Sequence, residues 1–349
     1  MESLLGIIFH SIGGFSSGSF YMPFKKVKNW AWESYWLVGG FFSWLIVPPI
    51  AAYLTIPNFV DIIATASPAI KAFTFSMGLI WGIGGLTYGL GVRYLGMSLG
   101  NSIVLGFCSA FGALVPSIYY NFYPTEGKIS FTDMLQSTGG QLVLLGVVVC
   151  LIGIAISGKA GILKEKDFAV GHEDKDKDFN LTKGLIIAVI SGILSSFFNY
   201  GIEAGKPMAE AAVVSGCNPL FQNNVTYIVL LWGGLTTNFI WCMYLNFKNK
   251  TFGDYTNKQT PITKNILFSA LAGTMWFLQF FFYGMGESKL GNGASSWILH
   301  MATIILTANF WGFYLKEWKG VSKKTFNTFL WGIGLIMLSI VLVGIGNSL

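Results

Sequence analysis

Long stretches without a charged side chain divide the sequence into candidate membrane-spanning helices. A helix rises ~1.5 Å per residue, so about 20 residues cross the roughly 30 Å of hydrocarbon in a bilayer. Because the runs are continuously apolar rather than alternating, they predict helices and not barrel strands. The sequence therefore predicts an all-α, polytopic membrane protein with ten transmembrane helices, one for each uncharged run longer than 18 residues: 3–24, 34–60, 72–92, 94–125, 134–158, 184–202, 211–247, 265–286, 290–315 and 325–349.

Composition agrees with this pattern. The chain is 53% hydrophobic and only 11% charged, whereas ordinary soluble domains carry roughly 25% charged residues. The first run begins almost at Met1 without a basic segment or a clear cleavage site, so we expect it to be a retained helix. The four cysteines have no C-x-x-C spacing, and we therefore expect neither a disulfide framework nor a metal site. No cofactor is indicated.

The net charge of +6 is distributed unevenly along the chain. If ten helices alternate across the membrane, 18 of the 22 Lys and Arg residues fall on one side. The positive-inside rule makes that side cytoplasmic and places both termini on the periplasmic side of a cell inner membrane. The excess of positive charge is thus accounted for by loops on one side of the membrane, so no nucleic-acid partner is expected. The other side carries Lys71, Lys128, Lys206 and Lys289.

The chain divides into two similar halves around a charged stretch. We expect a first five-helix repeat at 1–158, a cytoplasmic linker at 159–182 and a second five-helix repeat at 183–349. The halves share W-x6-Y-G (81–89 and 276–284), L-G-N (99–101 and 290–292) and a 12-residue glycine spacing. A five-helix repeat must insert its second copy upside down, and inverted repeats are typical of secondary transporters. Chance similarity among glycine-rich and aromatic-rich helices is the alternative.

Enzyme motifs are missing from the sequence. It contains no G-x-S-x-G, P-loop or H-E-x-x-H segment, so we expect neither catalytic residues nor an ATP-driven pump. Pro48 and Pro49 should kink or interrupt the second helix, because neither has a backbone N–H. What remains is polar side chains at membrane depth, which are costly and need a partner or a ligand.

Several polar and aromatic side chains recur at helical spacing and could form a binding site. A sugar needs flat aromatic surfaces for its C–H face and amide or hydroxyl groups for its own hydroxyls. Each Ser, Thr or Asn could instead bond a helix backbone, and each Tyr could be a packing residue. Thr303 and Thr307 share a helix face with Ser296. The substrate-binding candidates are Trp81, Tyr88, Asn199, Trp276, Gln279, Tyr283 and Ser296.

Three titratable residues are candidates for coupling to a proton. His10 and His300 lie in apolar runs, where a side chain with a reference pKa near 6.5 suits proton exchange. Glu203 ends the sixth run and could carry a proton or pair with Lys206. Glu287 ends the eighth run in a similar position.

Several stretches together resemble one transporter family. They are FYMPFKKVKNWAWES (20–34), WGIGGLTYGLGVRYLGMSLG (81–100), GKPM (205–208), MWFLQFFFYGMG (275–286), SWILHM (296–301) and LKEW (315–318). In order and over nearly the whole chain they resemble the L-rhamnose/proton symporter (RhaT) family of the drug/metabolite transporter superfamily. The resemblance implies an inner-membrane permease that imports L-rhamnose or a related monosaccharide with a proton. His10 and His300 fall where the family motif also has histidine, whereas no family carboxylate matches Glu203 or Glu287.

The expected partners are thus a small sugar, a proton and the lipid bilayer. The substrate would bind between the halves, and protonation would bias which side is open. The alternative is a drug or metabolite exporter built on the same scaffold, which predicts a wider and greasier cavity. A membrane receptor without transport activity is a third possibility, although the chain has no sizeable soluble domain.

Overall fold

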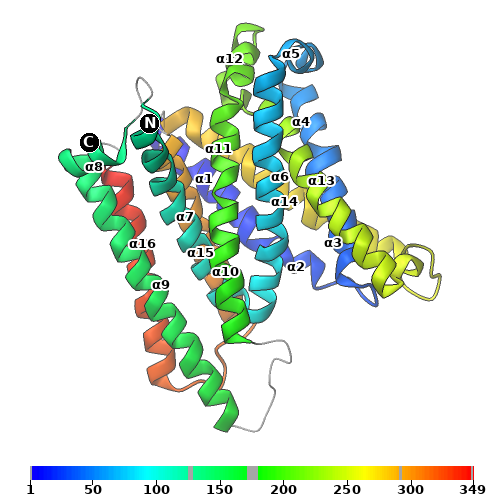
Figure 1. Ribbon diagram of the computed structural model, residues 1–349. Coiled ribbons are helices and arrows are strands. Elements are labelled where there is room, and N and C mark those ends of the chain that lie inside the picture. Colours follow the sequence, from blue (N-terminus) through cyan, green and yellow to red (C-terminus); the bar gives the residue numbers. More distant parts are fainter. Residues whose placement is uncertain (1, 125–128, 171–179, 291–292, 347–348) are drawn as a thin grey trace. The chain divides into compact units, whose positions relative to one another are not determined.

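The protein is described by a computed structural model covering residues 2–124, 129–170, 180–290, 293–346 and 349 (Figure 1). Within these ranges every regular element is a helix. The long helices are α1 (Glu2–Ser19), α6 (Pro68–Leu95), α7 (Met97–Phe122), α9 (Thr138–Val170), α10 (Leu181–Ser195), α13 (Asn224–Asn249), α14 (Ile262–Leu290), α15 (Gly293–Tyr314) and α16 (Lys323–Gly346). The shorter ones are α2 (Tyr21–Phe24), α3 (Trp32–Gly40), η1 (Phe41–Ile46), α4 (Val47–Thr55), α5 (Phe59–Thr65), α8 (Phe131–Gln136), α11 (Phe197–Ala204), α12 (Lys206–Val214), η2 (Pro219–Phe221) and η3 (Thr251–Tyr255).

Eight helical segments of the described chain are long and apolar enough to cross a membrane. They coincide with eight of the ten uncharged runs, so the predicted all-helical, polytopic class is confirmed. Two runs are not among the eight: run 3–24, which forms α1 and α2, and run 290–315, which contains α15. The count of ten and the inverted arrangement therefore stay predictions. The eight segments are Trp32–Thr55, Pro68–Leu95, Ser98–Phe122, Thr138–Phe168, Leu181–Val214, Pro219–Asn249, Ile262–Leu290 and Lys323–Gly346.

The helices form two compact units, and each unit combines segments from both halves of the sequence. Unit 1 contains Met1–Gly85 and Phe197–Lys289, and unit 2 contains Leu86–Ser196 and Leu290–Leu349. The chain passes between them within α6, after α10 and near the end of α14. Residues that are neighbours on one helix can therefore belong to different units.

The charged stretch between the halves is partly helical. α9 continues through Lys159 to Val170, so the first half of the expected linker prolongs a membrane helix. The rest of the linker up to Leu181 includes residues 171–179, which lie outside the described residues, as do Lys128 and the glycine and asparagine at 291–292.

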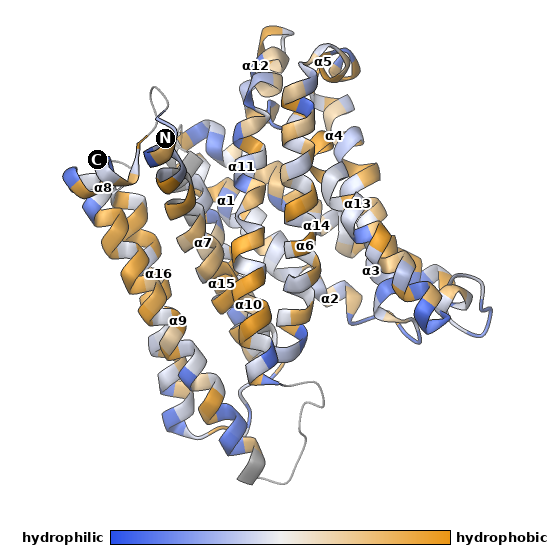
Figure 2. Cartoon of the chain, in the orientation of Figure 1, coloured by the Kyte–Doolittle hydropathy of each residue, from blue (hydrophilic) through white to orange (hydrophobic). Residues whose placement is uncertain are grey.

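In unit 2, α9 packs along α16 (Figure 1). Both helices are coloured as hydrophobic along most of their length in Figure 2. Their glycines permit the close approach: a Cβ added at Gly153 would lie 3.0 Å from the carbonyl oxygen of Gly332. Outward-facing side chains such as Val148 and Val341 are about half exposed, as expected for helices that face lipid tails.

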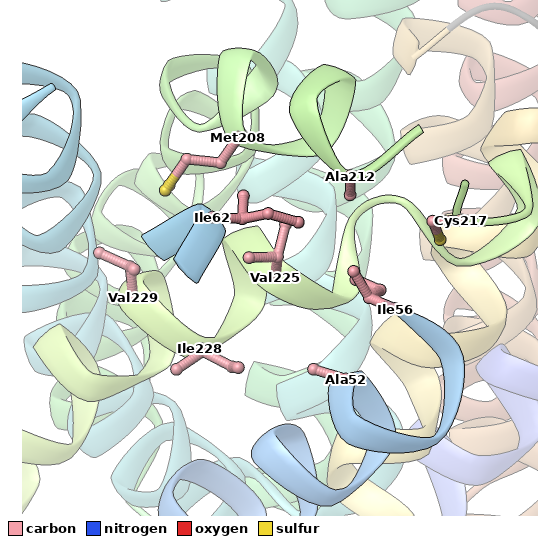
Figure 3. Close-up of a cluster of buried hydrophobic side chains, with 9 residues drawn as sticks. All are labelled: Ala52, Ile56, Ile62, Met208, Ala212, Cys217, Val225, Ile228 and Val229. Carbon is pink, nitrogen blue, oxygen red and sulfur yellow. The ribbon is translucent and has the colours of Figure 1, made fainter. Parts of the chain in front are cut away.

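In unit 1, the proline pair interrupts the regular helix that α3 and α4 would otherwise form. The six residues before Val47, Phe41–Ile46, adopt the wider π-helical turn η1. A proline ring in an α-helix clashes with the carbonyl four residues earlier, and a wider turn relieves that clash. α4 is then fixed in place by a buried apolar cluster that joins it to α5, α12 and α13 (Figure 3). That cluster consists of Ala52, Ile56, Ile62, Met208, Ala212, Cys217, Val225, Ile228 and Val229.

Candidate functional site

Three indole rings meet in the interior of unit 1. Trp81 of α6 and Trp276 of α14, both predicted from the sequence, have ring centroids 5.3 Å apart. Trp44 of η1 packs edge-on against both, at 6.2 Å from Trp81 and 5.8 Å from Trp276. Phe198 and Phe280 extend this set of rings from α11 and α14. Edge-to-face pairs of this kind fix ring positions by their quadrupoles, so the aromatic group is a rigid, oriented surface.

The members of this group differ in how much of each ring is accessible. Trp81 is 5% exposed and Trp44 is 3% exposed, whereas Trp276 is partly exposed. Gln279 is buried, and its side-chain amide donates to the backbone carbonyl of Trp276 at 2.8 Å. Trp276 therefore has the most accessible ring of the three, and the Trp81 ring packs against it. Asn199 of α11 is partly buried in the same unit.

His10 and Tyr283 are in contact, also within unit 1. Both side chains are fully buried, and their rings meet edge-on with centroids 5.4 Å apart. Gly286, three residues after Tyr283 on α14, provides the space: a Cβ there would lie only 2.6 Å from His10 Nε2. The two halves of the sequence thus bring a predicted proton residue from α1 against a predicted substrate residue from α14.

One turn further along α14, Glu287 lies beside the first turn of α13. The side-chain amide of Asn223 donates to its carboxylate at 2.9 Å. Glu203 and Lys206 interact electrostatically with the same carboxylate, with opposite signs. Glu203, the predicted proton carrier, therefore belongs to a small charged group at this end of α14, one turn beyond the His10 and Tyr283 contact.

Unit 2 contains the remaining predicted residues. The hydroxyl of Tyr88 donates to the side-chain oxygen of Asn101, so Tyr88 is bonded within its own unit. Trp81 and Tyr88, about two helical turns apart in W-x6-Y-G, belong to different units. Ser296 and His300 of α15 are both fully buried.

The threonines beside His300 bond the helix backbone. Thr303 donates to the carbonyl of His300 and Thr307 to that of Thr303, each at 2.9 Å. The backbone alternative is thus confirmed for both. His300 lies on a face whose threonine hydroxyls are already engaged.

Two residues of this neighbourhood were missed from sequence. Trp44 lies in a run with many aromatic residues, and its only distinguishing signal is the proline pair at 48–49. Asn223 is 64 residues from Glu287, and no local pattern connects them. The available signal was an amide side chain in a run without charged residues, because such a side chain at membrane depth needs a partner.

The long apolar helices define a multi-pass membrane protein. Aromatic and titratable side chains are buried among these helices. Residues 2–348 match the family described as L-rhamnose-proton symport protein (RhaT). The chain belongs to this family, which confirms the resemblance carried by the sequence motifs. It is a family of transporters, so the chain is not an enzyme.

Named relatives match over nearly their full length. The L-rhamnose-proton symporter of Yersinia pestis (strain Pestoides F) is 41% identical over 350 residues, covering 99% of this chain and 98% of the relative. The protein of the same name from Yersinia pseudotuberculosis serotype O:1b (strain IP 31758) gives the same figures, and that of Yersinia pestis bv. Antiqua (strain Antiqua) is 40% identical.

Proposed function

We propose that this protein imports L-rhamnose across the cell inner membrane in symport with protons. The observation that carries the proposal is the full-length family match, together with named symporters 41% identical over 99% of the chain. The match extends over nearly the whole of both chains and is not confined to one segment. A transporter needs no bound cofactor to couple two solutes, since a shared preference for one conformation is sufficient.

The aromatic group of unit 1 is the proposed sugar-binding surface. A 6-deoxy sugar presents an apolar face with a methyl group and an edge of hydroxyls, and the exposed part of Trp276 suits the apolar face. Trp81 packs against that ring, and Gln279 donates to the backbone carbonyl of the same residue. Asn199 and Tyr283, in the same unit, stay candidates for polar contacts, and Tyr88 and Ser296 stay predictions from the sequence.

The proton would bind among the titratable residues of the helices. In unit 1 these are His10, in contact with Tyr283, and Glu203 and Glu287 at the end of α14. His300 is the candidate in unit 2. The Asn223 amide makes Glu287 a stronger candidate than it was from sequence, because a carboxyl group can change protonation while it still accepts that hydrogen bond. A proton that moves inward across a membrane that is negative inside releases ~2.3 kcal/mol of free energy per 100 mV of membrane potential.

Periplasmic termini and two inverted repeats complete the proposal. Lysines at 25, 26 and 28 and at 248 and 250 lie near the end of α13 and the start of α14, where the backbone N–H of Lys28 donates to Asn265. Glu287 lies at the opposite end of α14. The positive-inside rule then makes the Glu287 end periplasmic, where protons enter.

Transport in proteoliposomes tests the proposal. Purified protein should accumulate L-rhamnose when the outside is acidic, and addition of rhamnose without an imposed gradient should alkalinise the outside. Sugar counterflow without any pH change would remove proton coupling but leave transport. No rhamnose flux, with efflux of an apolar cation instead, would favour the exporter alternative.

A further inference from the structure

Trp44, which no sequence pattern singles out, has an indole N–H without an acceptor in the described part of the chain. The side chain is 3% exposed, and Nε1 has no hydrogen-bond partner anywhere in the described part of the chain. A buried indole N–H normally finds an acceptor, and leaving a buried donor unsatisfied costs about 1–3 kcal/mol. An unsatisfied donor among aromatic rings is therefore a place where a ligand oxygen would be stabilised.

The orientation of this indole follows from a glycine one turn earlier. A Cβ added at Gly40 would lie 2.8 Å from Cε3 of Trp44 and 3.3 Å from Cη2. The six-membered part of the ring thus lies over Gly40, and the edge that carries Nε1 points away from its own helix. The Trp44 ring also packs against the rings of Trp81 and Trp276.

The backbone carbonyl of Trp44 lacks its usual donors as well. In an α-helix it would accept from the N–H of residue 48, and in a π-helix from that of residue 49. Both are prolines, which have no N–H. The N–H of Val47 is already bonded to the carbonyl of Phe42. Trp44 therefore offers a donor and an acceptor that its own helix cannot satisfy.

We infer that Trp44 binds the transported sugar and helps to determine its specificity, with its indole N–H donating to one sugar hydroxyl and its carbonyl accepting from another. The inference rests on the proposed function. Single π-turns occur frequently at functional sites, and η1 provides one beside the only partly exposed ring of the three indoles. The cluster in Figure 3 anchors α4 directly after the prolines, which keeps this turn in place.

The first test replaces the indole by a ring without an N–H. Trp44→Phe should raise the KM for L-rhamnose by about tenfold or more with a much smaller change in kcat, because a hydrogen bond to the bound sugar is lost. The matched control is Trp241→Phe on α13, whose ring is 43% exposed and which should keep the wild-type KM. Thermal unfolding of each variant separates a loss of packing from a loss of binding.

Pro48→Ala provides a second variant that leaves the ring intact. It returns an N–H four residues after Trp44, so the carbonyl regains a helical partner, and the KM should again rise while the protein folds at least as well. Deoxy analogues of L-rhamnose identify the contact: the analogue without the bonded hydroxyl should bind wild type and Trp44→Phe equally. Wild-type KM values in both variants would overturn the inference. Wild-type protein that transports no rhamnose would instead overturn the proposed function.

Discussion

The Oε2 oxygen of Glu317 accepts a hydrogen bond of 3.0 Å from the backbone N–H of Ser98. Ser98 is in the first turn of α7, whose N–H groups have no acceptor within the helix. Gly96 leads into this turn with φ +85°, a conformation that favours glycine, and a Cβ there would lie 3.1 Å from Glu317 Oε2. This contact gives a structural role to LKEW, one of the motifs that carry the family resemblance.

Glu317→Ala should destabilise the protein by about 1–2 kcal/mol, because the start of α7 loses a charged acceptor. Glu317→Gln keeps an oxygen acceptor without the charge and should lose less. The midpoint of thermal unfolding in detergent measures both. Equal midpoints for Ala, Gln and wild type would mean that this carboxylate does not stabilise the helix start.

Glu33 stabilises the loops at the opposite end of unit 1 from Glu287. Its Oε1 oxygen accepts from the Asn249 amide and the Thr251 hydroxyl, each at 2.9 Å, and the side chain is 4% exposed. Glu33→Ala leaves two donors without this acceptor, so we expect a loss of about 2–3 kcal/mol. Glu210→Ala, at an exposed position in the same unit, should change stability by less than about 0.5 kcal/mol. A similar effect of both substitutions would contradict this role.

The sequence predicted well those features that depend on local composition. Uncharged runs located eight membrane segments, because hydrophobic length alone decides whether a helix can span a bilayer. The interruption before Pro48 was also predictable, since a missing N–H is a local property. Trp81, Trp276 and Gln279 were selected by helical spacing, and they do lie together in unit 1.

Long-range pairing was not predictable from the same patterns. Nothing in the order of residues indicates that His10 meets Tyr283, or that Asn223 meets Glu287. The grouping of segments from both halves into each unit depends on helix packing, which a hydropathy pattern does not specify. The π-turn at 41–46 was likewise missed, because prolines indicate a break but not the form that it takes.

Gly286→Ala should impair transport because it displaces the His10 side chain. The added Cβ would lie 2.6 Å from the imidazole Nε2, so the ring must shift from its position against Tyr283. We expect uphill accumulation of rhamnose to fall at least about tenfold, the scale on which a misplaced functional group acts. Gly334→Ala on α16, where nothing lies within 4 Å of the added carbon, is the matched control and should transport normally. Normal accumulation by Gly286→Ala would show that the position of His10 does not matter.

Glu287→Gln tests the carboxylate that Asn223 holds. The amide can still take part in a hydrogen bond with Asn223 but cannot release a proton, so uphill uptake should be lost while counterflow of labelled rhamnose persists. Glu210→Gln is the control and should retain both activities. If Glu287→Gln still accumulates rhamnose against a gradient, Glu287 is not needed for proton coupling, and His10, His300 and Glu203 remain to be tested in the same way.

The part of Trp276 that is exposed predicts a graded effect of ring size on sugar affinity. Trp276→Phe keeps a smaller flat surface and Trp276→Ala removes it, so the KM for rhamnose should rise in the order Trp, Phe, Ala. The full change should be about 5- to 30-fold, corresponding to roughly 1–2 kcal/mol of lost ring contact. Trp241→Ala provides the control for loss of a large ring on a partly exposed helix surface. Because Trp276 also packs against Trp44 and Trp81, unfolding midpoints are measured in parallel. If the KM values of the variants change in parallel with their unfolding midpoints and not with the size of the ring, Trp276 has a packing role alone.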